Sequence, residues 1–266
     1  MIGYRVTLMN YCLVMITLLL GVLVKLTGSG SACGTSWPLC PHLFREPNLQ
    51  SMLEFSHRLS SALLGITVLS WLLISFRNSP WRWNELNLAL IGLLAAEAII
   101  GKVIVRLGLP DAPLSDLKAL VYIFHPAVSA TLLFISGVIH VKTAEPEKSF
   151  KRQNLIFCAL LLLATTGALN SLKLAEISAY SDSSHAFVIS SYIQNPEKLI
   201  HPFLGFVAMV LAFRNIENKF FKVLCLSVFT GILIPLLKSK LIIFAHNLAF
   251  VWCVHLLIFS QDNKKD

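Results

Sequence analysis

Long, nearly unbroken runs of apolar residues constrain the fold of this chain more than any other feature of its sequence. A helix needs about 20 such residues to cross the hydrocarbon core of a bilayer. The chain is 56% hydrophobic and only 14% charged over 266 residues, which excludes a water-soluble globule with an ordinary polar surface. We therefore expect an all-α, multi-pass membrane protein with eight transmembrane helices, at residues 7–26, 52–76, 86–107, 119–141, 153–172, 197–213, 220–237 and 240–260.

Two of these runs allow a different interpretation. The first resembles the apolar part of a signal peptide, but it is long enough to span and no small-residue cleavage site follows it, so we expect it to remain as a helix. The sixth is short and is interrupted by His201, Pro202 and Gly205. A re-entrant or interfacial segment is the alternative there.

The distribution of basic residues favours a topology with both termini in the cytoplasm. Outside the spans, twelve Lys and Arg residues lie at the two ends and in the even-numbered loops, against eight in the odd-numbered loops. The net charge of +8 then reflects orientation in a cell (inner) membrane, and no nucleic-acid partner is expected. The long loops 27–51 and 173–196 face outward in this topology.

Four histidines recur at one depth in alternate spans. With both ends inside, the second, fourth, sixth and eighth helices start at the outer face, and each has one histidine in its first two turns: His57, His125, His201 and His246. At 1.5 Å per residue, these imidazoles lie roughly 6–12 Å below the outer ends.

Histidines that face each other across a four-helix bundle are a common way to hold haem iron. The eight spans divide into two pseudo-repeated halves of four helices, residues 1–141 and 142–266, so the four histidines predict one haem site in each half. A zinc or copper site is the competing interpretation. It requires ligands gathered in one small cage, and the sequence has no paired His-x-His or Cys-x-x-Cys motif.

The loop between the first two spans holds the other candidates. Cys33 and Cys40 suit a disulfide in an oxidising compartment, with a redox-active dithiol as the alternative. Glu54 lies three residues before His57 and shares its helix face. Ionisable groups at membrane depth usually mark a site, although both residues could merely flank the end of a span at headgroup level.

Other polar residues in the spans receive no site assignment. Glu97 and Lys102 either pair within the bundle or mark its interior, and Arg58 suits a haem propionate or a lipid phosphate equally. His140 and His255 lie at predicted inner helix ends, where an interfacial position is expected.

The motif Thr-Gly-Ser-Gly-x-x-Cys-Gly-x-x-Trp-Pro-Leu-Cys at 27–40, followed by Glu-x-x-His-Arg at 54–58, resembles the haem A synthase family. These membrane enzymes convert haem O to haem A for terminal oxidases. The motif is specific in the first half, whereas the second half contributes only its helices and placed histidines. The resemblance implies an oxidoreductase that converts the C8 methyl group of haem O to a formyl group by successive hydroxylations.

The resemblance also implies a role for each candidate. His57 and His125 would bracket the substrate haem in the first half, and His201 and His246 would ligate a haem b in the second. Glu54 matches the family's functionally required glutamate. Cys33 and Cys40 match its outer cysteine pair, but the loop at 173–196 lacks the second pair that many relatives have.

Two other functions fit four histidines. One is a two-haem, quinol-oxidising electron carrier, which leaves Glu54 and the cysteine loop without a task. The other is a carrier that releases haem unchanged. The expected partners of the enzyme are haem O, membrane lipid, haem O synthase, the terminal oxidase assembly and an electron donor that the sequence does not name. A homo-oligomer is compatible with the sequence.

Overall fold

The computed structural model of the protein describes residues 2–36, 39–44, 47–78, 84–109, 116–150, 157–158 and 240–259, and the regular secondary structure in them is all helical. The chain divides into two compact units, Met1–Lys148 and Ser149–Asp266. Apart from residues 157–158, the predicted spans at 153–172, 197–213 and 220–237, together with His201 and the loop 173–196, lie outside the described residues.

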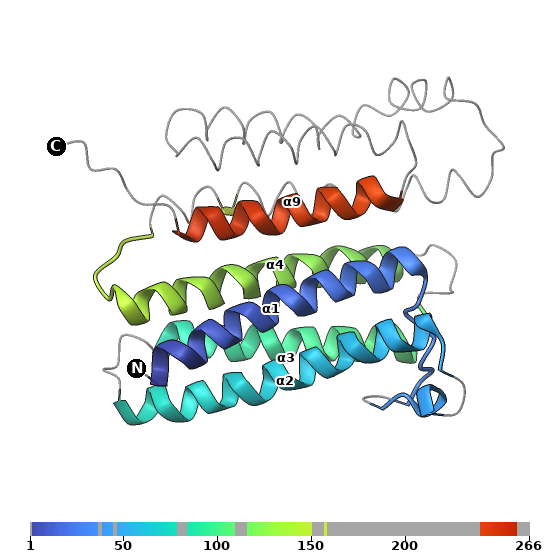
Figure 1. Ribbon diagram of the computed structural model, residues 1–266, viewed down its shortest axis with the longest axis horizontal. Coiled ribbons are helices and arrows are strands. Elements are labelled where there is room, and N and C mark those ends of the chain that lie inside the picture. The colour runs from blue at the N-terminus through green and yellow to red at the C-terminus, as the bar shows by residue number, and fades with distance from the viewer. Residues whose placement is uncertain are drawn as a thin grey trace, which may run out of the picture. The chain divides into compact units, whose positions relative to one another are not determined.

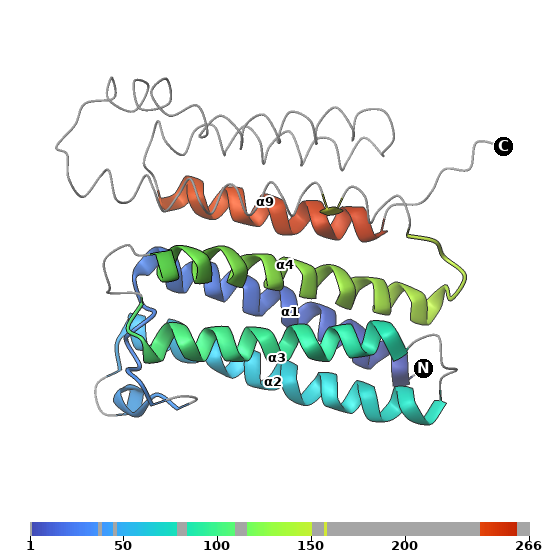
Figure 2. The same ribbon diagram turned by 180° about the vertical axis from the view of Figure 1, so that it is seen from behind.

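The first unit is a bundle of four long helices that alternate in direction (Figures 1 and 2). They are α1 (Ile2–Thr27), α2 (Leu49–Asn78), α3 (Asn84–Arg106) and α4 (Asp116–Ala144), with a short 3₁₀ turn, η1 (Pro41–Phe44), before α2. The main packing contacts of α1 are with α2 and α4, and those of α3 are also with α4 and α2. Therefore α2 and α4 occupy opposite corners of the bundle and run in the same direction.

All four helices are long and apolar enough to cross a membrane, and the protein is a multi-pass membrane protein. Hydropathy therefore predicted each of these spans. The helices begin two to five residues before the predicted spans, because polar residues in the membrane interface continue the backbone hydrogen bonding beyond the apolar run. The total of eight helices, the internal repeat and the cytoplasmic termini remain predictions.

Local signals at the helix ends fix the loop that joins α1 to α2. Gly28 ends α1 with a φ of 68°, a left-handed conformation that glycine adopts without a Cβ clash. The backbone N–H of Ser29 donates to the carbonyl of Val24 at 2.9 Å, as in a Schellman motif. At the other end of the loop, Asn48 caps α2, because its Oδ1 accepts a hydrogen bond from the N–H of Ser51 at 2.8 Å.

Polar contacts between helices hold the opposite end of the bundle. The indole N–H of Trp71 in α2 donates to Asn87 of α3 at 2.8 Å, and both side chains are buried. His140 of α4 is also buried, with Nδ1 3.1 Å from the hydroxyl of Thr7 in α1. The hydroxyl on α1 thus gives the His140 ring a hydrogen-bonding partner inside the bundle, four residues before the end of α4, and its interfacial depth remains a prediction.

In the second unit the structure describes one long helix, α9 (Lys240–Phe259). His246 lies in its second turn. Trp252 and His255, three residues apart on one side of α9, stack with their ring centroids 5.2 Å apart. Buried apolar side chains, among them Val254 and Leu257, show that α9 packs within a core.

Candidate functional site

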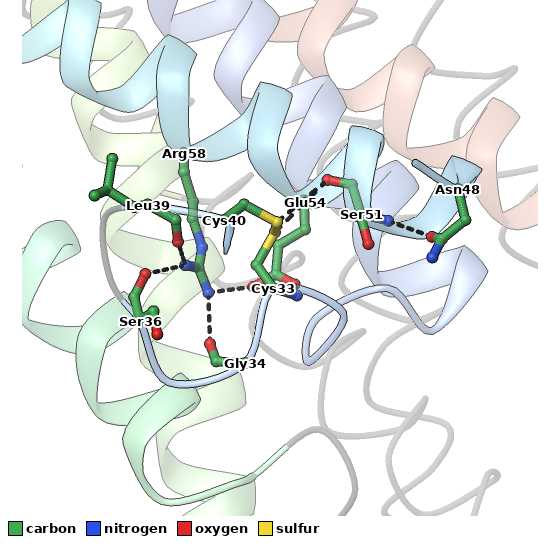
Figure 3. The surroundings of a disulfide bond; sticks show 9 residues. All are labelled: Cys33, Gly34, Ser36, Leu39, Cys40, Asn48, Ser51, Glu54 and Arg58. Carbon is green, nitrogen blue, oxygen red and sulfur yellow. Dashed lines mark hydrogen bonds and ion pairs between the residues drawn. A yellow bond between two sulfur atoms is a disulfide. The ribbon is translucent and has the colours of Figure 1, made fainter. Parts of the chain in front are cut away.

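A disulfide joins Cys33 to Cys40 in the loop between α1 and α2, as the sequence predicted (Figure 3). Both residues are almost fully buried, and the Sγ atom of Cys33 lies 3.6 Å from the carbonyl oxygen of Ser51 in the first turn of α2. The disulfide is therefore packed against the start of α2 and does not stand free in solvent.

Arg58 of α2 binds this loop through its guanidinium group. Its guanidinium group donates to the carbonyl oxygens of Leu39 at 2.9 Å, Gly34 at 3.1 Å and Ser36 at 3.3 Å (Figure 3). A fourth contact is an ion pair with Glu54 at 2.5 Å. Because four acceptors surround a guanidinium that is 5% exposed, its contacts are with the protein's own loop.

Glu54 is engaged through both carboxylate oxygens. Oε1 pairs with Arg58, and Oε2 accepts a hydrogen bond from the backbone N–H of Cys33 at 2.7 Å. The residue is 3% exposed, so water competes only weakly with the two partners for the carboxylate oxygens. This geometry gives Glu54 a clear role in anchoring the disulfide loop. Its role in catalysis stays a prediction.

His57 lies one turn below Glu54 in α2, on the side of the helix that faces α1. Its Nδ1 atom is 3.0 Å from the backbone carbonyl oxygen of Thr17. A carbonyl can only accept, so we assign the proton to Nδ1, which leaves a lone pair on Nε2. Gly21, one turn further along α1, gives the ring room, because a Cβ at that position would lie 3.1 Å from Cε1 of His57.

His125 in α4 has a carboxylate in the equivalent place. Its Nδ1 atom is 2.5 Å from Oε2 of Glu97 in α3. The other oxygen of Glu97 accepts a hydrogen bond from the hydroxyl of Ser129 at 2.5 Å. Pro126, which follows His125 inside α4, has no N–H to donate to the carbonyl of Tyr122, so the helix lacks one backbone hydrogen bond next to this histidine.

The two imidazoles lie at one level on opposite corners of the bundle. His57 is eight residues into α2 and His125 is nine residues into α4, or about 12 and 13.5 Å along their axes. Contacts with α1 agree with this level. Gly21 lies beside His57, and one turn further Lys25 lies over the ring of Tyr122, 5.6 Å from its centroid and one turn before His125.

This donor set fits haem iron. Nδ1 of His57 has a backbone carbonyl as acceptor, which sets the tautomer that a neutral nitrogen ligand needs. Nδ1 of His125 lies 2.5 Å from a carboxylate oxygen of Glu97 as an ion-pair contact, without the geometry of a hydrogen bond. Neither Nε2 atom has a hydrogen-bond partner among the described residues. Two such rings on opposite helices suit a flat macrocycle within a bundle. In the described residues, no group of three or more His, Cys, Asp and Glu residues gathers at one point.

The structure places the remaining candidates as follows. His246 lies in α9, away from the helix ends, and His201 lies outside the described residues. Glu97 was not assigned to a site from sequence, although it is the one acidic residue within the predicted span 86–107. It does not pair with Lys102. Five residues along a helix separate two side chains by about 140°, and Glu97 contacts α4 instead.

Curated proteins with names from haem biosynthesis are similar to part of this chain. A region of 105 residues is 38% identical to proteins named haem A synthase from Bacillus cereus (strain AH187) and Bacillus anthracis (strain A0248), covering 38% of this chain and 34% of each relative. A region of 121 residues is 34% identical to a protoheme IX farnesyltransferase from Thermus thermophilus, covering 43% of this chain and 20% of that protein.

The matched regions thus span about a third or less of the length of these relatives. No family model matches the chain. The similarities relate the protein to the membrane proteins that process haem.

Proposed function

We propose that this protein is a haem A synthase that converts the C8 methyl group of haem O to a formyl group. The observation that carries the proposal is the pair His57 and His125, two imidazoles at one level on opposite corners of a membrane bundle. Nδ1 of His57 has a carbonyl acceptor, and Nδ1 of His125 lies beside the Glu97 carboxylate. The partial similarity to proteins named haem A synthase supports the same activity.

The reaction on the substrate has three stages. Two successive hydroxylations each insert one oxygen atom of dioxygen into a C–H bond of the methyl carbon, while two electrons from the electron donor and two protons reduce the other oxygen atom to water. The resulting geminal diol then loses one water molecule and becomes the formyl group. The iron of the bound porphyrin supplies the oxidising chemistry, and the protein supplies binding, orientation and electrostatics.

Residues of the first unit would perform these tasks of the protein. His57 and His125 would hold the substrate iron and so set the plane of the macrocycle within the bundle. Arg58, the residue after His57, binds the disulfide loop that joins α1 to α2, and this loop would limit the access of water.

Glu54 is the residue that we propose to handle protons. It lies one turn from His57, and its carboxylate is close to the loop rather than open to solvent. Release of either the Cys33 N–H or the Arg58 contact would free a carboxylate oxygen to accept a proton during the hydroxylations or the loss of water.

We also assign a haem b to the second half, with His201 and His246 as ligands. This assignment comes from the resemblance to haem A synthases and from the placement of one histidine in each of two predicted spans. Haem O synthase, the terminal oxidase assembly and an electron donor are the partners that this function requires. Membrane lipid surrounds the bundle, and a homo-oligomer is compatible with it.

Co-expression of the full chain with a source of haem O tests the proposal. Haems extracted from the membranes are separated by chromatography and identified by mass. We expect a haem A peak that disappears in the variant His57→Ala with His125→Ala. If haem O stays unmodified although the wild-type chain binds it, the protein is a carrier; quinol oxidation without any haem A would identify an electron carrier.

A further inference from the structure

We propose that the two histidines of the first unit bind haem iron unequally, with His125 as the stronger ligand and His57 as the ligand that is more readily displaced. The inference rests on the proposed function, because it requires both imidazoles to ligate one iron. It follows from the different chemical nature of the partner on each Nδ1 atom.

His125 has a charged partner that is itself held in place. Oε2 of Glu97 is 2.5 Å from Nδ1 of His125, and Oε1 accepts a hydrogen bond from Ser129. The Glu97 side chain is 12% exposed, so water competes weakly for these contacts. The contact is an ion pair without hydrogen-bond geometry, and a negative charge this close to Nδ1 favours positive charge on the imidazole. It therefore increases the basicity of the ring and strengthens the bond from Nε2 to a metal.

His57 has a neutral partner. Its Nδ1 atom is 3.0 Å from the peptide carbonyl oxygen of Thr17, and no carboxylate contacts the ring among the described residues. A neutral carbonyl dipole favours positive charge on the ring less than the full negative charge of a carboxylate does. The imidazole of His57 therefore gains less basicity from its partner than that of His125.

The difference in ligand strength determines which histidine would leave the haem iron first. Haem iron held by both His57 and His125 would have no free position, so a small external ligand would have to displace one of the two imidazoles. The weaker bond belongs to His57 on α2. The side that opens is therefore the one that faces α2, the helix that also contains Glu54 and Arg58.

The test compares single-ligand variants of the full chain, expressed with a haem O source. His57→Ala leaves His125 as the ligand, and His125→Ala leaves His57. The measured quantity is extracted haem O plus haem A per polypeptide, which separates the first site from any haem b. We expect His57→Ala to retain more of this haem than His125→Ala.

Glu97→Gln then identifies the source of the difference. In the His57→Ala background it should weaken haem binding by about tenfold, the lower end of the range for loss of an outer-shell partner. In the His125→Ala background it should have no such effect. Glu85→Gln, an exposed position in the first turn of α3, is the matched control and should leave haem content unchanged in both.

A redox titration provides a second readout that does not depend on activity. With both histidines present, Glu97→Gln should raise the midpoint potential of the first-site haem, because loss of the carboxylate destabilises ferric iron. Ser129→Ala removes one of the two contacts on Glu97 and should shift the potential in the same direction by less. It also keeps the inference testable if Glu97→Gln does not fold.

The outcomes separate this inference from the proposed function. Equal haem loss from the two single-ligand variants, with an unchanged potential in Glu97→Gln and Ser129→Ala, would overturn the inequality and leave the ligand pair intact. Full retention of haem O and of a low-spin spectrum in both single-ligand variants would instead overturn the assignment of the ligands.

Discussion

At the scale of single residues, the polar side chains of the bundle are defined by what each one contacts on a neighbouring segment. Spacing in the sequence correctly put Glu54 and His57 on adjacent turns of one helix. It did not reveal that the Glu54 carboxylate contacts Cys33 and Arg58, because the position of the loop depends on the disulfide and on tertiary packing. The same limit hid the pairing of Glu97 with His125, which joins two helices.

Glu54→Gln separates catalysis from loop anchoring. The amide keeps the size of the side chain and can still accept the Cys33 hydrogen bond, but it has no charge and no titrating proton. We expect the variant to fold, to keep haem in both halves, and to accumulate haem O or the hydroxylated intermediate. Chromatography of extracted haems measures this, and wild-type yields of haem A would leave Glu54 as a loop anchor only.

Gly21→Ala should disturb His57 specifically. Alanine in a helix interior normally stabilises by roughly 0.5–1 kcal/mol relative to glycine. Here the new Cβ would lie 3.1 Å from Cε1 of His57, so the ring must shift by a few tenths of an ångström. We expect a weaker low-spin signal from the first-site haem.

Gly65→Ala in α2 is the control for that substitution. A Cβ there meets no atom within 4 Å, so the variant should keep the haem spectrum and match or exceed wild-type thermal stability. An identical spectrum in Gly21→Ala would show that the His57 ring has no defined place beside α1.

At the scale of elements, the sequence predicted the helices better than the connections between them. Apolar runs located α1 to α4, and their extra turns follow from end signals such as Asn48 and Gly28, which are recognisable once the helix phase is known. The connection between α1 and α2 could be identified as a cysteine loop. The hydrogen bonds from Arg58 to the carbonyl oxygens of this loop could not be predicted, because every residue has a backbone carbonyl and the sequence does not show which ones will accept.

The loop should survive loss of its disulfide. A disulfide that closes so few residues contributes only about 2–3 kcal/mol through chain entropy, and the Arg58 and Glu54 contacts remain. We expect Cys33→Ala with Cys40→Ala to fold and bind haem with reduced activity, and Cys12→Ala, at an exposed free cysteine in α1, to behave as wild type.

Thiol labelling of the denatured, non-reduced protein checks the bond itself. The chain has six cysteines, and two of them should resist labelling until a reductant is added. Labelling of all six without reductant would show that the purified protein contains no disulfide.

At the scale of the whole molecule, the predicted division into halves means that one haem can be lost without the other. In the proposed function each haem site would take its ligands from one half, so His201→Ala or His246→Ala should remove the low-spin haem b signal while the first site keeps its haem. Optical and electron paramagnetic resonance spectra measure the two populations. Loss of both haems from a correctly folded variant would contradict independent sites.

The pairing of each histidine with its own partner also has a consequence for assembly. The hairpin α1–α2 contains His57 and the carbonyl that orients it, and the hairpin α3–α4 contains His125 and its carboxylate. Each hairpin thus contains one proposed ligand together with the group that contacts its Nδ1 atom. A bound porphyrin would link the two hairpins through these ligands. A ligand that binds only the joined form stabilises it by about 2.7 kcal/mol at a hundredfold excess over its Kd. Cells starved of haem should therefore accumulate bundles whose hairpins separate at lower temperature, which limited proteolysis of heated membranes would detect.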